Sequence, residues 1–425
     1  MASGPSSDVV THALEEVWRA HRDTATGTVA TYIPELAHAS AEHFGLALTS
    51  MAGNRYHAGD ADIRFTLQSV SKPFVYALAL AELGADELSK WVNNEPSGEA
   101  FNAISLEPGS GRPANAMINA GAIAVTSLIR AATPALRCER ILETLSAFAG
   151  RTLDIDERVY ASEAAHGDRN RALAYLVHNA RGLPIDPMEA VDIYFRQCAI
   201  RADVSDLATM AGTLANGGLN PVTKVRVVPE EVAVQVLSVM ASCGMYNSSG
   251  DWLVNVGLPA KSGVSGALIA ASPARFGVAA FSPPLDAMGN PVRGVSALRN
   301  VASRWGLHLM HHPSRTMETI TELSVTKDSR SQLTITTLGV QGDVDFTAAE
   351  RLLWALTHDA PAGSALLLDL RWVSVIDDLA LAMLDTGLAP WRNNVAIVGM
   401  KWPGKTHFNN RDAALEYLAQ LKRSS

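Results

Sequence analysis

The spacing of apolar residues changes several times along the chain, and each change predicts a different kind of element. Residues 8–21 carry apolar side chains three and four positions apart, which is typical of an amphipathic helix. Short β-rich stretches at 44–50 and 55–69 then predict antiparallel strands. From Val70 to about Met245 the helical spacing returns in segments separated by Gly, Pro and Asn, which predicts a helical block.

Strand-like segments follow the helical block. They lie at 253–263, 266–273 and 276–284, and a predicted helix at 294–310 closes this part of the chain. A sheet built from strands on both sides of a helical block makes an α/β domain with two lobes. Because clefts form where lobes meet, we expect a binding site there.

A second unit begins near Ser314, where strands and helices alternate over a length that suits one small α/β domain. Its predicted order is strand, strand, helix, strand, helix, strand, helix. These elements lie at 319–327, 332–339, 346–358, 364–370, 378–388, 393–399 and 412–422. We therefore predict two domains, residues 1–313 and 314–425.

Composition excludes several classes of protein. The hydrophobic fraction of 48% and the charged fraction of 18% describe a folded chain rather than a disordered one. A formal charge of −8 without a basic face argues against a nucleic-acid partner. There is no apolar run long enough to span a membrane and no secretory signal pattern, so a cytoplasmic protein is expected.

Cysteine usage agrees with a reducing compartment. Cys138, Cys198 and Cys243 lie far apart and form no Cys-x-x-Cys pair. They indicate reduced thiols, not a disulfide framework or a zinc site.

The pattern Ser-x-x-Lys occurs twice, at Ser69–Lys72 and at Ser324–Lys327. The second match ends a predicted strand, where Lys327 is most simply a solvated turn residue. The first lies where a strand gives way to a helix, with Pro73 in the first turn, a position that tolerates proline. Residues three apart share one helix face, so Lys72 is expected to reach Ser69 Oγ.

A serine hydroxyl needs a base, and lysine serves as one only when burial or another cation lowers its pKa. Lys261, in the segment LPAKSGVSG, is the candidate cation. A lysine, a hydroxyl residue and a glycine on a strand are similar to the third motif of penicillin-interacting serine enzymes. The alternative is that Lys72 and Lys261 are solvated charges. The two motifs together favour catalysis.

Eight ordered motifs between Val9 and His311 extend this pattern. They are YIPELA, QSVSK, MINAGAI, GDRN, DIYFRQC, CGMYNSSG, LPAKSGVSG and FSPPLDAMGNPVRG. This series resembles the serine-dependent glutaminases, whose fold is β-lactamase-like, with an antiparallel sheet and a helical block. The resemblance implies that Ser69 is the nucleophile, Lys72 its base and Tyr246 the proton relay toward the leaving ammonia. It places the oxyanion hole at the backbone N–H groups of Ser69 and Val264.

The same resemblance implies substrate contacts from Tyr32, Asn119, Glu163, Asn170 and Tyr194. Free glutamine carries an ammonium, a carboxylate and an amide, so its site needs one buried anion, several donors and a nucleophile. Each residue also has an ordinary structural alternative: the asparagines as helix caps, the tyrosines as core aromatics, the glutamate as a surface charge. One departure from the family pattern is Asn247, where Asp is usual.

Two further patterns are weak. Gly399–Thr406, GMKWPGKT, fits a phosphate-binding loop, but Trp402 is bulky, Pro403 lacks an N–H donor, and helix signals begin only near Asn410. The histidines of HLMHHP, His308, His311 and His312, have no carboxylate partner nearby and read as a polar linker edge. No metal or cofactor is expected.

The second domain, from about Glu318 to Lys422, resembles the STAS family, the domain of anti-sigma factor antagonists and of sulfate-transporter tails. The segments GDVDFTAAERL and LLLDLRWVSVIDDLALAML carry the resemblance. Phosphorylatable members have a serine where this chain has Asp378, so the resemblance implies a docking module without that switch.

These observations favour an amidohydrolase that converts L-glutamine to L-glutamate and ammonia through a Ser-Lys acyl-enzyme. It is expected to form a homo-oligomer, a dimer or tetramer, with a possible protein partner for the STAS-like domain. A β-lactamase or cell-wall peptidase would share the chemistry but needs export. A scaffold with an inactive enzyme lobe is the other alternative, and the intact Ser69, Lys72, Tyr246 and Lys261 argue against it.

Overall fold

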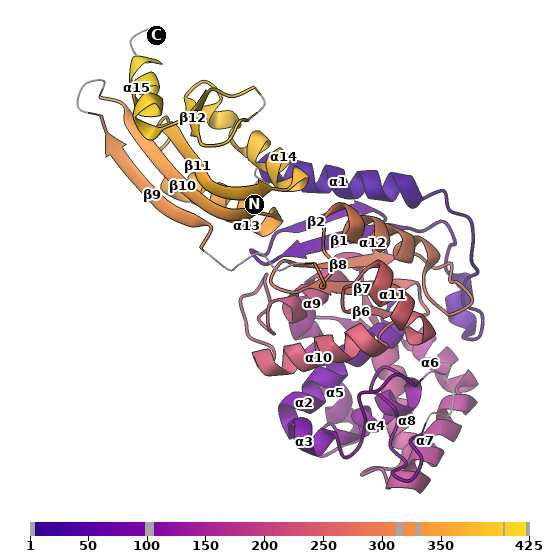
Figure 1. Cartoon of the computed structure of the whole chain (residues 1–425). Coiled ribbons are helices and arrows are strands. Elements are labelled where there is room, and N and C mark those ends of the chain that lie inside the picture. Colours follow the sequence, from indigo (N-terminus) through magenta and orange to yellow (C-terminus); the bar gives the residue numbers. More distant parts are fainter. Residues whose placement is uncertain (1–4, 98–105, 312–317, 329–331, 403, 422–425) are drawn as a thin grey trace. The chain divides into compact units, whose positions relative to one another are not determined.

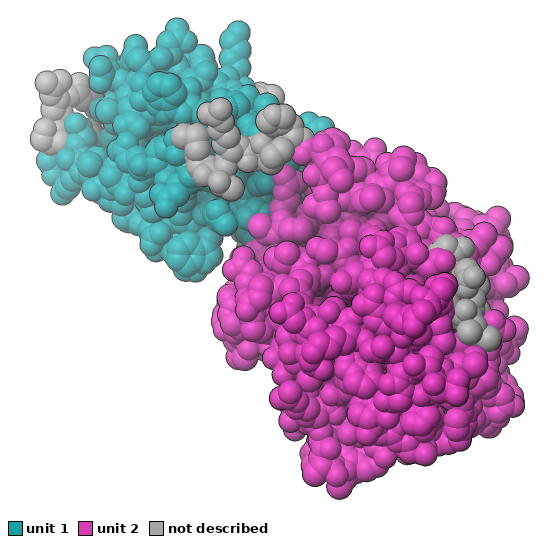
Figure 2. Space-filling view, turned by 60° about the horizontal axis from the view of Figure 1, so that its bottom comes forward, with its two compact units in different colours: residues 1–12, 312–425 teal, residues 13–311 magenta. Residues whose placement is uncertain are grey.

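The structure, a computed structural model, describes residues 5–97, 106–311, 318–328, 332–402 and 404–421. The chain divides into two compact units, shown in Figure 2. The larger unit is Ala13–His311, and the smaller unit combines Met1–His12 with His312–Ser425. The predicted boundary between residues 313 and 314 lies outside the described residues.

An antiparallel five-stranded sheet forms the frame of the larger unit, in the order β2-β1-β8-β7-β6 (Figure 1). Strands from the two ends of the unit meet where β1 pairs with β8, with Gly45 opposite Phe281. This pairing confirms a sheet assembled from both sides of the helical block. The strands are β1 (Gly45–Ser50), β2 (Arg55–Gly59), β6 (Ala260–Ser262), β7 (Ala267–Ser272) and β8 (Phe276–Phe281).

Helices pack on both faces of this sheet, so β1, β7 and β8 are buried along their whole length. The approach of α9 is unusually close. A Cβ on Gly277 of β8 would lie only 2.0 Å from the backbone nitrogen of Gly212 in α9. Small residues in these strands therefore allow the helix to lie directly on the sheet. The flanking helices are α9 (Val204–Ala215) and α12 (Val292–Arg304), and α1 (Pro5–His21) enters this unit at Ala13.

The helical block between β3 and β6 confirms the prediction for residues 70–245. Its core combines apolar residues of several helices, among them Phe74, Phe148 and Met240. The helices are α2 (Lys72–Leu83), α3 (Ala85–Leu88), α4 (Asn119–Leu128), α5 (Pro134–Ala149), α6 (Glu157–His166), α7 (Asp168–Arg181), α8 (Pro187–Cys198) and α10 (Glu230–Cys243). Short 3₁₀ turns are η1 (Pro34–His38), η2 (Gln68–Ser71) and η3 (Tyr246–Ser248).

A small three-stranded sheet, in the order β3-β5-β4, lies within this block. Both pairings are antiparallel, and Arg201 in the middle strand lies opposite Thr66 on one side and Asp154 on the other. The strands are β3 (Phe65–Thr66), β4 (Asp154–Ile155) and β5 (Ile200–Ala202).

The strand predicted at 253–263 is wrong in its first half. Residues Ser249–Asn255 form helix α11, and β6 begins only at Ala260. Trp252 and Val256 are buried while Val254 is 76% exposed. Burial four residues apart is the helical spacing, and alternating apolar letters had concealed it. The predicted helix at 294–310 likewise ends early, at Arg304.

The smaller unit has a second five-stranded sheet, in the order β13-β12-β11-β10-β9. Only the β9–β10 pair is antiparallel. Ala414 and Leu418 of α15 pack on Ile335, Leu367 and Val398 of the sheet. The elements follow the predicted order, with the short η4 and the edge strand β13 not predicted: β9 (Ile320–Lys327), β10 (Thr334–Val344), α13 (Phe346–Asp359), β11 (Ala365–Ile376), α14 (Asp378–Gly387), η4 (Ala389–Trp391), β12 (Val395–Val398), β13 (His407–Phe408) and α15 (Arg411–Leu421).

The weaker sequence patterns lie in or beside this unit. Lys327 is an exposed strand-end residue, as predicted. The stretch after Lys405 enters strand β13 rather than a helix, so the described part of the loop does not have the architecture of a phosphate-binding loop. His312 and Pro403 lie outside the described residues. Within the described part of the chain, no cluster of potential metal ligands and no helix able to cross a bilayer is found.

Candidate active site

Ser69 lies in a sharp turn between a strand and a helix. β3 ends at Thr66, η2 contains Ser69, and α2 begins at Lys72. Gln68, directly before the serine, has a backbone φ of 48°. This is the left-handed conformation, which residues other than glycine rarely adopt. Ser69 itself is 5% exposed. The turn therefore holds a hydroxyl at the start of a helix, where N–H groups are still unpaired.

Lys72 is fully buried, and two acceptors hold its ammonium. Nζ donates to Asn119 Oδ1 at 2.7 Å and to the Met117 carbonyl at 3.3 Å. Burial lowers the pKa of Lys72 to about 8, against the opposing influence of Cys198 and Glu163. No hydrogen bond from Lys72 to Ser69 is found among the described residues. In an unliganded enzyme such catalytic bonds are often open and tighten only with substrate.

Asn119 connects several predicted site residues. Its Oδ1 also accepts from Tyr194 Oη at 3.3 Å, and its Nδ2 donates to Asn170 Oδ1 at 2.9 Å. Asn119 begins α4 but makes no capping bond, and Asn170 lies inside α7. The capping interpretation is therefore wrong for both asparagines, whose amides are hydrogen-bonded to each other.

Tyr246 is hydrogen-bonded to Ser69 from a distant part of the chain. Its backbone φ is 53°, and its hydroxyl donates to the Ser262 carbonyl at 3.0 Å. Burial raises the pKa of Tyr246 to about 12, although hydrogen bonds to Ser69 and Ser262 act in the other direction. The phenol therefore keeps its proton at neutral pH.

Lys261 of β6 is completely buried behind Tyr246. Nζ donates to the carbonyls of Gly244 and Ser262, each at 2.8 Å, and lies 3.9 Å from the centre of the Tyr246 ring. Burial, followed by the charge of Lys72, lowers the pKa of Lys261 well below its ordinary value. The low pKa of Lys72 follows from its own burial, so the predicted help from Lys261 is not needed to explain it.

The turn after β6 lies against the segment that carries Ser69. A Cβ on Gly263 would lie 2.9 Å from the Leu67 carbonyl oxygen. This close approach brings Val264, the next residue, beside η2. Among the described residues, no acceptor is found for the backbone N–H of either Ser69 or Val264. Two such donors near a reacting carbonyl are the requirement for an oxyanion hole.

Glu163 is a buried carboxylate, not the surface charge of the alternative interpretation. It is 5% exposed and accepts a hydrogen bond from Gln68 Nε2 at 3.4 Å. Burial raises the pKa of Glu163 to about 8, opposed by the Gln68 bond and the charge of Lys72. A carboxylate held this way is poised to ionise when a cation arrives.

A cavity of about 80 Å³ lies between Ser69 and Glu163. Its wall includes six of the predicted residues: Tyr32, Ser69, Asn119, Glu163, Asn170 and Tyr194. Tyr32 as a residue is 55% exposed, yet burial around its hydroxyl, and then the charge of Glu163, raise its pKa. Tyr246 and Val264 line an adjoining hollow with Tyr32.

Several neighbours were not predicted, and two of them contact predicted site residues. Gln68 lines the cavity and bonds Glu163; its only sequence signal was its place directly before Ser69. Cys198 is a buried free thiol hydrogen-bonded to Tyr194. Its role depends on packing, which the sequence does not display.

Comparison with known proteins agrees with this geometry. A family model described as Glutaminase matches residues 27–310. The chain belongs to the glutaminase family. Glutaminases of Corynebacterium efficiens and Corynebacterium glutamicum are 40% and 43% identical, over 93% and 88% of this chain and 92% and 90% of theirs. This glutaminase is accordingly an amidohydrolase that converts L-glutamine to L-glutamate and ammonia.

Solved glutaminase structures share its α/β fold. A crystal structure of Mglu superposes with a TM-score of 0.71 at 39% identity, covering 95% of this chain and 98% of that one. A probable glutaminase from Bacillus subtilis, complexed with 6-diazo-5-oxo-L-norleucine, gives a TM-score of 0.65 at 30% identity and covers 73% of this chain and 98% of that one.

Proposed function

We propose that hydrolysis proceeds through an acyl-enzyme on Ser69, with Lys72 as the base. The observation that carries the proposal is the burial of Lys72, which gives it a pKa of about 8 one helical turn from a serine that opens into the cavity. Neutral Lys72 takes the Ser69 proton as Oγ attacks the substrate's side-chain amide carbon. The N–H groups of Ser69 and Val264 stabilise the developing oxyanion.

Tyr246 passes the proton to the leaving nitrogen. Its pKa of about 12 keeps it protonated, and its hydroxyl lies between Ser69 and the Ser262 carbonyl. The C–N bond breaks, ammonia leaves, and water then attacks the ester, with Lys72 as base again. Lys261 supports the ring of Tyr246 from behind. Each step uses groups of this chain.

The substrate's α-amino and carboxylate groups bind at the far end of the cavity. Glu163 is the anion for the ammonium, and the hydroxyls and amides of Tyr32, Asn119, Asn170 and Tyr194 are donors for the carboxylate and the chain. Relatives crystallised in a glutamate form, or with 6-diazo-5-oxo-L-norleucine, support a site for molecules of this size and charge.

The deciding experiment is Ser69→Ala, with glutamine turnover measured by ammonia release. We expect a loss on the order of 10⁴-fold or more, because the covalent step disappears while little volume is removed. Ser238→Ala, on the exposed face of α10, is the matched control and should keep full activity. Retention of more than a few per cent of activity in Ser69→Ala would refute the assignment.

We further propose that the smaller unit is a STAS-like docking domain. Its sheet order and helix order support this interpretation, as does the fixed charge at the start of α14. Asp377 caps that helix by accepting from Ala380 N at 2.6 Å, and Asp378 follows in its first turn. Negative charge is favourable there, so the helix start resembles a permanently modified state.

Assembly and location complete the proposal. We propose that the protein forms a homodimer or homotetramer and that its STAS-like domain binds a protein partner. We also propose a cytoplasmic location. The three free thiols agree with a reducing compartment.

A further inference from the structure

Two strands of the small sheet β3-β5-β4 lead to the two ends of the site, Ser69 and Glu163. β3 leads directly to Ser69, and β4 leads into α6, which carries Glu163. The backbone at the start of β5 holds the residues that follow β3 and β4. Leu67 N donates to the Ile200 carbonyl at 2.8 Å, and Asp156 N donates to the Ala199 carbonyl at 2.9 Å. The separation of nucleophile and carboxylate therefore depends on this sheet.

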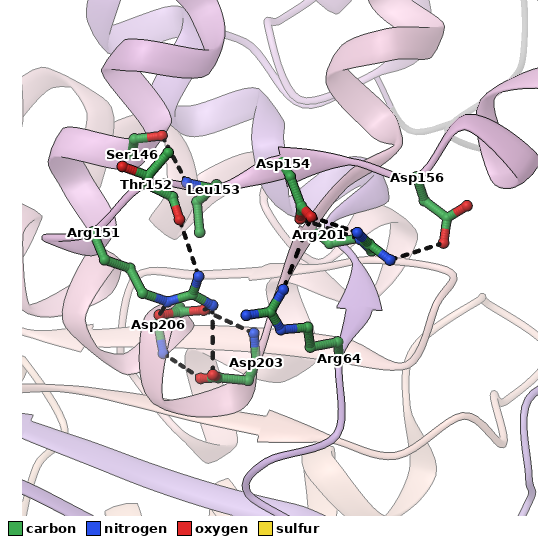
Figure 3. Close-up of polar contacts among 10 residues, drawn as sticks. All are labelled: Arg64, Ser146, Arg151, Thr152, Leu153, Asp154, Asp156, Arg201, Asp203 and Asp206. Atoms are coloured by element: carbon green, nitrogen blue, oxygen red, sulfur yellow. Dashed lines mark hydrogen bonds and ion pairs between the residues drawn. The ribbon is translucent and has the colours of Figure 1, made fainter.

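A cluster of three arginines and four aspartates borders the sheet (Figure 3). Arg201 of β5 lies at its centre. Its Nε donates to Asp154 Oδ1 at 3.1 Å, and its Nη2 donates to the other oxygen of the same carboxylate. Nη1 faces Asp156 Oδ2 at 3.9 Å. One planar guanidinium therefore bridges β4 and the residue that begins α6.

Asp156 transmits this contact to the helix. Its Oδ1 accepts from Arg158 N at 3.0 Å and from Val159 N at 3.2 Å, which is the capping arrangement. Glu163 follows seven residues later, two turns along the same helix. On the other side of β5, Thr66 lies opposite Arg201 and its Oγ1 accepts from Gln68 Nε2, the same amide that bonds Glu163.

We propose that Arg201 is a positioning residue for the glutaminase reaction. By bridging Asp154 and Asp156 it fixes the start of α6, and so sets the distance from Glu163 to Ser69. The inference rests on the proposed roles of those two residues. Arg201 is 35% exposed in its side chain and Asp154 48%. Ion pairs this open to solvent add little to the free energy of unfolding. If Arg201 only stabilised the fold, its replacement would therefore change little that can be measured.

The test compares two competitive inhibitors, L-glutamate and glutarate, which differ only in the α-ammonium. The ratio of their inhibition constants measures how well Glu163 meets that ammonium. In Arg201→Gln we expect the preference for L-glutamate to fall about fivefold or more, because α6 is no longer held in register. Arg201→Lys should recover most of the preference, since an ammonium can still pair with Asp154.

Arg151→Gln is the matched control within the same cluster. Its guanidinium is 32% exposed and pairs with Asp206 and Asp203 at the start of α9, not with α6. This variant should lose thermal stability because the buried carboxylate of Asp206 is left without its charged partner. It should nevertheless keep the ratio of inhibition constants. An equal change of the ratio in Arg151→Gln would show that the effect is general loosening and would overturn the proposal.

Glu163→Gln separates failure of this inference from failure of the proposed function. If Glu163→Gln leaves the preference for L-glutamate unchanged, the ammonium site is elsewhere, and the proposed roles of both Glu163 and Arg201 are refuted. If Glu163→Gln abolishes the preference while Arg201→Gln keeps it, only the role of Arg201 is refuted.

Discussion

At the scale of single residues, the site holds two groups whose pKa values coincide. Burial lowers the pKa of Lys72 to about 8 and raises that of Glu163 to about 8. The proposed mechanism needs Lys72 neutral and Glu163 ionised, so both must lose a proton. Activity should therefore rise as the pH increases through 8.

The pH profile gives a specific prediction. In the free enzyme both groups titrate, so log kcat/KM should rise with a slope approaching about 2 below pH 8. Bound substrate brings its ammonium to Glu163 and lowers that pKa, so log kcat should rise with a slope of about 1. Initial-rate measurements from pH 6 to 9 test this; equal slopes for the two parameters would contradict the assignment of Glu163.

The second residue-scale prediction concerns Glu163→Gln. At pH 9 the wild-type carboxylate is ionised, and losing the buried pair with the substrate ammonium costs about 3 kcal/mol, or a ~100-fold rise in KM. At pH 6 the gap should shrink, because a protonated glutamate resembles glutamine. Glu157→Gln, an exposed position on the same helix, should leave KM unchanged at both pH values. A pH-independent gap would point to a steric cause instead.

The sequence identified most residues that line the cavity, because each lies in a short ordered motif. It did not indicate how Asn119 divides its bonds among Lys72, Tyr194 and Asn170. It also missed Gln68. These features arise from burial and from side-chain direction, neither of which a one-dimensional pattern records.

At the scale of elements, the helical block and the alternation in the smaller unit were predicted closely, since their apolar spacing is regular. The segment at 253–263 was not, because Trp252 is buried in a helix that Val256 ends, while Val254 between them is exposed. A sheet shared by both ends of the larger unit was predicted, but the register of β1 against β8 depends on tertiary packing.

Gly263 gives the prediction at this scale. Gly263→Ala places a Cβ 2.9 Å from the Leu67 carbonyl, so the β6 turn or η2 must shift. Because both proposed oxyanion donors lie in these segments, we expect kcat to fall at least tenfold with a smaller change in KM. Gly250→Ala, where an added Cβ meets nothing within 4 Å, is the control and should keep kcat. Unchanged kcat in Gly263→Ala would remove this turn from the oxyanion hole.

At the scale of the whole molecule, every residue with a proposed catalytic or substrate-binding role lies between Tyr32 and Val264, inside the larger unit. The smaller unit has its own sheet and its own core. A chain ending at His311 should therefore keep glutamine hydrolysis within about threefold of the full-length rate, because no proposed site residue is removed.

The same truncated chain tests the role of the smaller unit. Light scattering gives its mass in solution and hence the number of subunits in the oligomer. If the smaller unit contributes to assembly, this number should differ from that of the full chain. A soluble, folded fragment without activity would disprove dispensability. Identical subunit number and kinetics would leave the smaller unit without a role in assembly or catalysis.

The left-handed backbone at Gln68 and Tyr246, two neighbours of Ser69, has a consequence for heat inactivation. Conformations of this kind cost about 1 to 3 kcal/mol each and persist only while their surroundings enforce them. On warming, the two turns should relax before the helices and sheets melt. The enzyme should therefore become inactive at a temperature where its circular dichroism is still that of the native protein, and recover on cooling.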